Sequence, residues 1–191
     1  MRLPVRLASV TALLLFPFAI GSSARQAAKV NPNAATINEF VKRVDVYVAL
    51  RKKLEDTLPP LGKQTDPKQI DTHERALGKL IQDARATAKP GDLFQPSMQR
   101  LVRSLLAPVF RGKDGAQIRS EIMDNEYKGS VVLAVNARYP DEVPISTVPP
   151  QVLSELPKLP EELEYRFIRT NMILFDPHAH IIADFVERAF R

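Results

Sequence analysis

Cysteine is absent from the 191 residues of this chain. Disulfide bonds and thiolate metal sites are therefore excluded, and an N-terminal lipid anchor on cysteine is excluded as well. The sequence also lacks a glycine-rich phosphate-binding loop and a Gly-x-Ser-x-Gly nucleophile elbow. The fold must be stabilised by a packed apolar core.

The chain carries little excess charge. Its formal net charge is +5 at neutral pH, and it has no basic stripe with interleaved aromatic residues. Such a stripe is typical of nucleic-acid-binding proteins. We therefore expect no nucleic-acid partner.

The first 24 residues are typical of a cleavable secretory signal peptide. Arg2 and Arg6 form a positively charged start, residues 7–20 form an apolar run, and small residues follow at 21–24. The run, about 14 residues long, is shorter than the roughly 20 residues that a helix needs to cross a bilayer. We expect a periplasmic or secreted protein with no membrane span after cleavage.

Cleavage is expected after Ala24, with Ala28 as the second choice, and an uncleaved anchor is the alternative. Removal of two arginines and no acid would lower the formal charge from +5 to +3. Residues 25–35 are polar, small and unpatterned, which predicts a flexible leader.

A small helical domain is predicted over residues 36–127. Thr36 and Glu39 have the spacing of a capping box, and apolar residues then recur at three- and four-residue steps to about Thr57. Asp66, followed by a proline, predicts the start of a second helix. These signals indicate an array of helices joined by short connections.

Two further helices complete the array. Pro96 predicts the start of the third helix, and a weaker fourth helix is expected over residues 117–127.

The pattern changes near Lys128. Residues 131–135 form a β-branched run that predicts a strand. Six of the 21 residues from 140 to 160 are proline, which leaves room only for one short helix over residues 150–156.

A β-hairpin is predicted near the end of the chain. Residues 164–175 form its first strand, residues 176–180 a turn, and the apolar residues from 181 onward its second strand. A terminal helix over residues 183–190 is the alternative. The predicted fold class is α+β: an N-terminal helical array, then a proline-rich segment and β-hairpin module over residues 128–191.

The turn contains the candidate metal ligands Asp176, His178 and His180. Two histidines separated by one residue point the same way on a strand and can share a divalent ion. The alternative is a polar turn in which proline and aspartate set the bend. A similar Asp-x-His-x-His string occurs in amidohydrolases, but their barrel needs about 250 residues and further ligands.

Other chemical signals are weaker. His73 and Glu74 begin like a helix-borne zinc protease motif, but Leu77 stands where the second histidine is needed. Acid pairs such as Glu161 and Glu162 are suited to acid–base work on a glycan, although such pairs ordinarily form a solvated surface. The sequence therefore contains no complete catalytic constellation.

Four residues of the first hairpin strand are candidate partner-binding residues. Arg166 and Arg169, with Tyr165 and Phe167, are suited to a small cationic and aromatic face for an anionic ligand or a protein edge. Ordinary cross-strand pairing with nearby acids is the alternative.

Residues 148–160, followed by Leu-Glu-Tyr-Arg-Phe at 163–167, carry a resemblance to a family of exported bacterial proteins. Those proteins share a signal peptide, a helical front, and a proline-rich lead-in to a Tyr-Arg hairpin with an aspartate after the first strand. The matching aspartate is Asp176, and Asp184 follows in the second apolar run. The resemblance implies an exported location and this architecture. More distantly, the tail is similar to that of RcnB-like periplasmic proteins, which are associated with nickel and cobalt homeostasis.

The sequence thus predicts an exported, non-enzymatic accessory or binding protein that contacts an envelope protein through the hairpin and its proline lead-in. The alternatives are a periplasmic metal-handling protein using His178 and His180, and a small cell-wall hydrolase. No cofactor is expected unless the turn binds a divalent metal, and the pattern specifies no oligomeric state.

Overall fold

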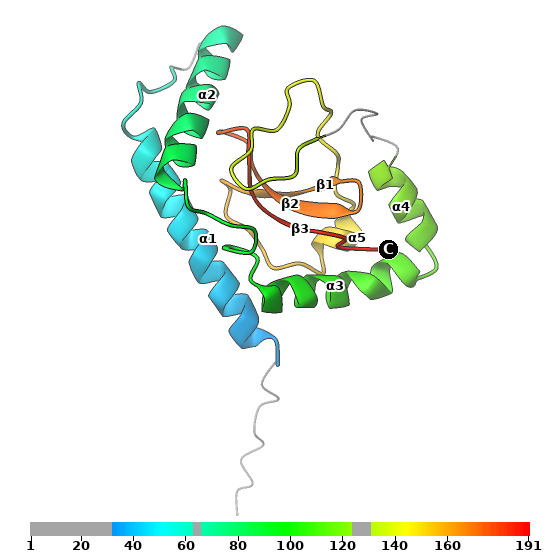
Figure 1. Ribbon diagram of the computed structural model, residues 1–191. Helices are drawn as coiled ribbons and strands as arrows, with labels where there is room; N and C mark the ends of the chain where they lie inside the picture. Colours follow the sequence, from blue (N-terminus) through cyan, green and yellow to red (C-terminus); the bar gives the residue numbers. More distant parts are fainter. Residues whose placement is uncertain (1–31, 63–65, 124–130) are drawn as a thin grey trace, which may run out of the picture. The chain divides into compact units, whose positions relative to one another are not determined.

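The computed structural model describes residues 32–62, 66–123 and 131–191, which belong to one compact unit. The predicted signal peptide and most of the leader lie outside the described residues. The described ranges contain five helices followed by a three-stranded antiparallel sheet, which confirms the α+β class (Figure 1). The elements are α1 (Ala34–Glu55), α2 (Pro67–Ala84), α3 (Pro96–Arg111), α4 (Gly115–Met123), α5 (Pro150–Leu153), β1 (Glu164–Ile168), β2 (Asn171–Asp176) and β3 (Ile181–Val186).

Local signals placed the starts of α2 and α3 correctly. The Asp66 carboxylate accepts a hydrogen bond from the amide of Gln69 at 2.9 Å, and the Gln69 side chain accepts one from the amide of Asp66 at 3.3 Å. This capping box satisfies two backbone donors that the first turn of a helix leaves unpaired. Pro67 and Pro96 occupy the first turns of α2 and α3, where a missing amide hydrogen costs nothing.

The start of α1 differs from the prediction. The helix begins at Ala34, so Thr36 lies inside it and the expected capping box is not formed. The Glu39 carboxylate instead accepts a hydrogen bond from Arg43 at 2.9 Å, one turn further along the helix. α4 is present from Gly115, and the last residues predicted for it, 124–127, lie outside the described residues.

The sequence predicted a two-stranded hairpin, but this part of the chain forms a sheet of three strands. Ile168 pairs with Asn171, so Arg169 and Thr170 form a two-residue turn that divides the expected strand 164–175. Arg169 adopts a φ of 56°, the left-handed conformation that tight hairpin turns require. The alternative terminal helix is also wrong, because β3 continues to Val186 with all six residues buried.

No strand forms at residues 131–135. A segment just beyond them covers the outer edge of β3: the amide of Asn136 donates to the carbonyl of Ile182 at 2.8 Å, and the amide of Ile182 donates to the carbonyl of Ala137 at 2.9 Å. Half-buried apolar side chains at 131, 133 and 135 pack against one face of the sheet instead. The β-branched run is therefore a packing segment.

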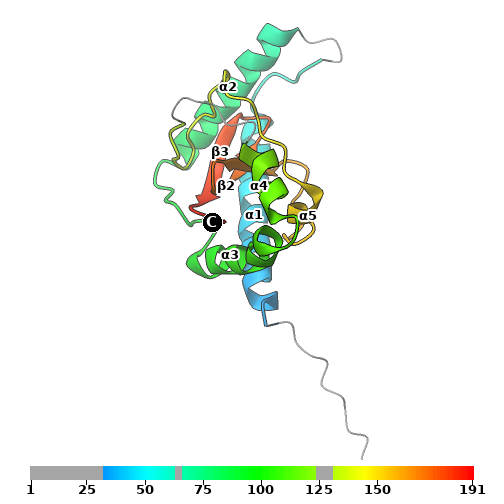
Figure 2. The same ribbon diagram turned by 90° about the vertical axis from the view of Figure 1, so that its right-hand side faces the viewer.

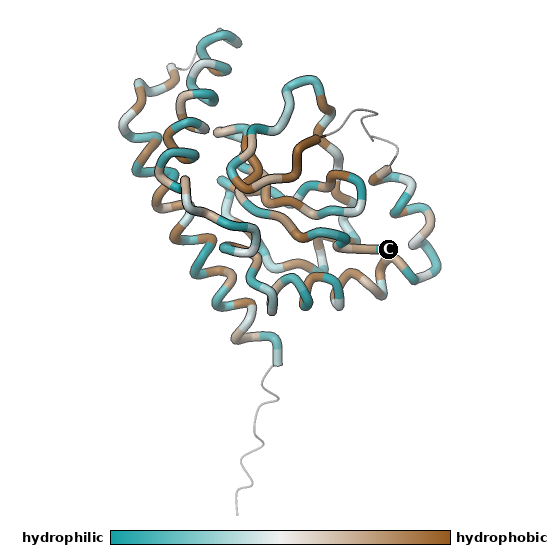
Figure 3. Tube along the Cα trace, viewed as in Figure 1, coloured by the Kyte–Doolittle hydropathy of each residue, from teal (hydrophilic) through white to brown (hydrophobic). Residues whose placement is uncertain are grey.

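The sheet is buried on both faces. One face joins the helices in a single apolar core, and α3 passes beneath the sheet in both Figure 1 and Figure 2. The other face packs under the segment around Tyr139 and Val143. Figure 3 shows apolar residues following the strands. In the described ranges, no helix has both the length and the apolar character needed to cross a membrane.

Helix α2 approaches the turn between β2 and β3 very closely. A Cβ atom added at Gly78 would lie 2.9 Å from the carbonyl oxygen of Ala179. Only glycine permits this distance without movement of the backbone. The turn that contains the two histidines is thus packed against α2.

Candidate functional site

Asp176 ends β2 and is completely buried. Its Oδ2 atom accepts hydrogen bonds from the Tyr47 hydroxyl at 2.8 Å and from Arg51 Nε at 3.1 Å. Its Oδ1 atom accepts from the amides of His178 and Ala179 at 3.1 and 3.0 Å. Burial, together with the neighbouring carboxylate, raises the pKa of Tyr47 well above its ordinary value. Four donors thus surround one carboxylate, which ties α1 to the turn after β2.

Arg51 extends this network toward the surface. Its side chain is 3% exposed, and Nη1 donates to Glu55 at 2.9 Å. Nη2 lies 2.7 Å from His178 Nδ1. Since guanidinium nitrogens only donate, Nδ1 must accept, and the proton of the neutral ring lies on Nε2. His73 lies nearby, with its Nε2 3.7 Å from a Glu55 oxygen.

The candidate metal ligands are placed in different surroundings. Both carboxylate oxygens of Asp176 accept two hydrogen bonds each, and the Nδ1 atom of His178 accepts one from Arg51. His180 adopts a φ of 53°, and its Nε2 lies 3.5 Å from an Asp141 oxygen. Within the residues that the structure describes, no three histidine, aspartate or glutamate side chains gather in a metal-binding group.

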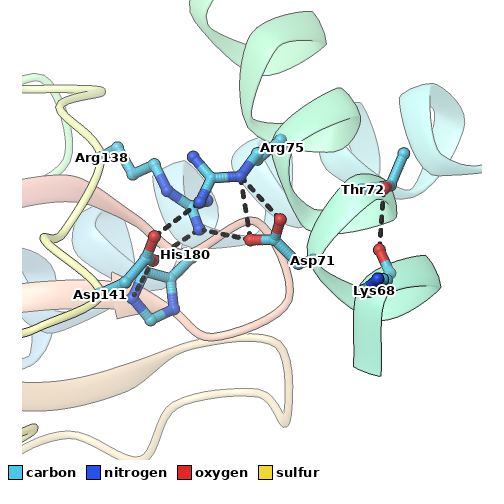
Figure 4. A network of polar contacts seen from close by, with 7 residues as sticks. All are labelled: Lys68, Asp71, Thr72, Arg75, Arg138, Asp141 and His180. Atoms are coloured by element: carbon cyan, nitrogen blue, oxygen red, sulfur yellow. Dashed lines mark hydrogen bonds and ion pairs between the residues drawn. The ribbon is translucent and has the colours of Figure 1, made fainter. Parts of the chain in front are cut away.

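His180 lies at the edge of a charged network that sequence analysis did not identify (Figure 4). Arg75 of α2 donates to Asp71 at 2.9 Å and to Asp141 at 2.7 Å, and Arg138 donates to Asp141 at 2.6 Å. Burial, with the nearby Arg138 charge, lowers the pKa of His180. The network fastens α2 to the segment that covers β3. Its members are separated by up to 70 residues, so no local pattern marks it.

Asp184 is a second buried carboxylate with a structural role. It accepts from the amides of Gly91, Leu93, Phe94 and Phe185 at 2.8 to 3.0 Å. Burial raises its pKa, and the four amide donors oppose that effect. The carboxylate fixes the connection between α2 and α3 against β3. Neither buried aspartate has an oxygen left for acid–base chemistry.

The four candidate partner-binding residues do not share a face. Tyr165 and Phe167 are 5% and 3% exposed and point into the core, where the Tyr165 hydroxyl donates to the carbonyl of Pro157 at 3.0 Å. Side chains alternate along a strand, so Arg166 lies on the opposite face and pairs with Glu164. Arg169 lies in the exposed turn. Only the two arginines remain outside the core.

A groove of about 390 Å³ lies between the proline-rich lead-in and the start of β1. One wall consists of Leu153, Pro157, Lys158 and Leu159, and the other consists of residues 163–166. Leu153 is 45% exposed, which makes it an uncovered apolar side chain on the rim. Of the four residues that the sequence predicted for partner binding, Tyr165 and Arg166 line this groove, whereas Phe167 and Arg169 do not.

The outer edge of β1 borders this groove. β1 is an edge strand of the sheet. Among the described residues, Ser146 hydrogen-bonds to its outer edge at one position: its hydroxyl accepts from the Phe167 amide at 3.1 Å and donates to the Phe167 carbonyl at 2.9 Å. Outward-pointing backbone groups recur at every second residue of an antiparallel edge strand. The amide and carbonyl of Tyr165 therefore also point away from β2, on the side of the groove that Tyr165 lines.

Comparison with known proteins adds no assignment, because no family model matches the chain and no solved structure matches it.

Proposed function

We propose that this is an exported, non-enzymatic binding protein that captures an extended segment of an envelope protein at the groove beside β1. The observation that carries the proposal is the outward backbone of Tyr165 on an edge strand, next to an apolar wall. A peptide added to such an edge gains main-chain hydrogen bonds, while neighbouring pockets select its side chains.

The groove has the features that such binding needs. Alternate side chains of an added strand would meet Leu153, Pro157 and Leu159, which provide apolar contact. Lys158 on one wall and Glu164 on the other provide charges of both signs. These charges favour a segment that is apolar at the centre of the groove and polar on either side of it.

Two observations support a non-enzymatic role. The buried carboxylates of Asp176 and Asp184 are saturated by donors, so each holds backbone or side chains in place. The metal-handling alternative would require His178 to give up its contact with Arg51. Glu55 and Asp56 line one surface pocket together with His73, but Glu55 is paired with Arg51, so this pair of acids does not favour the hydrolase alternative. The export component depends on the N-terminal sequence pattern.

The test uses a phage-displayed library of random decapeptides, selected on the purified protein. Affinities of the selected peptides are then measured by calorimetry for the wild type and two variants. Leu153→Glu places a charge on the apolar wall, which a bound segment would have to desolvate, so we expect at least a tenfold loss of affinity. Val46→Glu places the same charge on an exposed apolar position of α1 and should change affinity less than twofold.

The proposal fails if no peptide is selected. It also fails if the selected peptides bind the Leu153→Glu variant as tightly as the wild type. Both substituted side chains are exposed, so the melting temperatures of the two variants should match that of the wild type.

A further inference from the structure

Four arginine residues line one pocket beside helix α3. The pocket, about 210 Å³ in volume, lies where α3 meets residues 188–191. Its arginines are Arg103, Arg111, Arg188 and Arg191, and the remaining lining residues are two alanines and two phenylalanines. No acidic side chain is among the residues that line it.

None of the four arginines in this pocket is paired with an acidic side chain of another described residue. Arg111, Arg188 and Arg191 are exposed, and no hydrogen bond or ion pair to another described residue engages their guanidinium groups. Arg103 is anchored by hydrogen bonds of 3.3 and 2.9 Å from its Nε and Nη2 atoms to the carbonyl of Glu187. Helix α3 itself contains three arginines and no acid.

The backbone that carries these arginines is held in place. Phe190 stacks on Phe110 with ring centroids 4.0 Å apart, and the Ala189 amide donates to the carbonyl of Thr170 at 2.8 Å. The Arg188 amide donates to the Asn171 side chain at 3.0 Å. A ligand that binds here would not have to order the chain first, which favours affinity.

We infer that this pocket binds a phosphate group. The planar guanidinium group of arginine can donate two parallel hydrogen bonds to phosphate oxygens. Several arginines together can balance the negative charge of a phosphate group, about −1.5 to −2 at neutral pH. The volume is below the roughly 300–1,000 Å³ of pockets for drug-sized ligands, so it suits a single phosphate group. Free phosphate compounds and phospholipid head groups share this chemistry. The inference is independent of the peptide groove.

The test begins with calorimetric titration of the purified protein with inorganic phosphate. The double variant Arg111→Gln/Arg188→Gln removes two pocket arginines and should lose at least tenfold in affinity. The control Arg100→Gln/Lys113→Gln removes the same charge from exposed positions on and beside α3 that do not line the pocket, and should change affinity less than twofold.

A second arm identifies the source of the phosphate. Flotation with phosphatidylglycerol vesicles, compared with phosphatidylcholine vesicles, tests the head group. Binding to the anionic vesicles that inorganic phosphate competes away, and that the pocket variant loses, assigns a phospholipid. Phosphate binding without vesicle binding assigns a free phosphate compound. The inference is overturned if neither probe binds, or if both double variants weaken binding equally, which would indicate only a generally positive surface.

Discussion

Replacement of Asp176 by asparagine tests the buried network between α1 and the sheet. The change keeps the shape of the side chain and removes its charge. One oxygen can still accept from the amides of His178 and Ala179, but the new amide nitrogen must then face Arg51 Nε, which is also a donor. The guanidinium group of Arg51 loses its buried counter-charge.

The magnitude follows from the burial of both partners. Removal of one member of a buried ion pair costs about 3–5 kcal/mol. Glu55 still pairs with Arg51, so we expect the lower end, about 3 kcal/mol, in the free energy of unfolding. In a chain of this size, that loss lowers the melting temperature by about 6–12 °C.

The assay is urea unfolding at pH 7, followed by circular dichroism. The control is Asp83→Asn, which breaks a pair with Lys79 in which both side chains are more than 60% exposed. Exposed pairs contribute about 0–1 kcal/mol, so the control should unfold near the wild-type midpoint. A loss below about 1 kcal/mol for Asp176→Asn would refute the argument that this carboxylate holds α1 against the sheet.

Two further predictions concern export and pH. The protein recovered from the periplasm of a bacterial host should have the mass of a chain that begins at Arg25, and recovery of the uncleaved chain in the membrane fraction would contradict the signal-peptide hypothesis. The pKa of His180 is lowered by burial and by Arg138, so on acidification the unfolded chain takes up a proton first, near its usual pKa of about 6.5. Stability should therefore fall as pH is lowered from 7.5 to 5, with a smaller fall in His180→Gln, and equal falls in the two proteins would contradict this role.

Local signals predicted the helical half of the fold well. Asp66-Pro67 and Pro96 act on their own first turns, so a few neighbouring residues suffice to place α2 and α3. Pro150 starts a helix for the same reason, although α5 ends at Leu153, before the predicted limit. The capping box predicted at Thr36 does not form, because the helix already begins at Ala34 and Thr36 lies inside its first turn.

The sheet was harder to predict because its boundaries depend on pairing. Arg169 is neither glycine nor asparagine, yet it adopts the left-handed conformation of a tight turn, and nothing in the alternating sequence marks that position. The run 131–135 has strand-forming residues but packs on the sheet without joining it. Strand propensity indicates that a segment fits a half-buried surface, and a segment can do so either by joining a sheet or by packing on its face.

In the candidate site, too, features set by neighbouring residues could be predicted, and features set by distant contacts could not. The sequence indicated the region of β1 and its proline lead-in, but it could not show that Tyr165 and Phe167 face the core, because the helices that cover them are distant in sequence. The local pattern predicts Asp176 as a metal ligand, because its actual partners, Tyr47 and Arg51, lie more than 120 residues earlier in α1. Such long-range polar contacts leave no local pattern.

The proposed function is tested most directly at the amide of Tyr165. A selected peptide is added to the ¹⁵N-labelled protein, and amide hydrogen exchange is followed by NMR. If the peptide pairs with the outer edge of β1, the Tyr165 amide should exchange more slowly and its resonance should shift, whereas amides on the exposed face of α1 around Val46 should not change. A peptide that binds without altering the Tyr165 amide would contradict the assignment of this groove as the binding site.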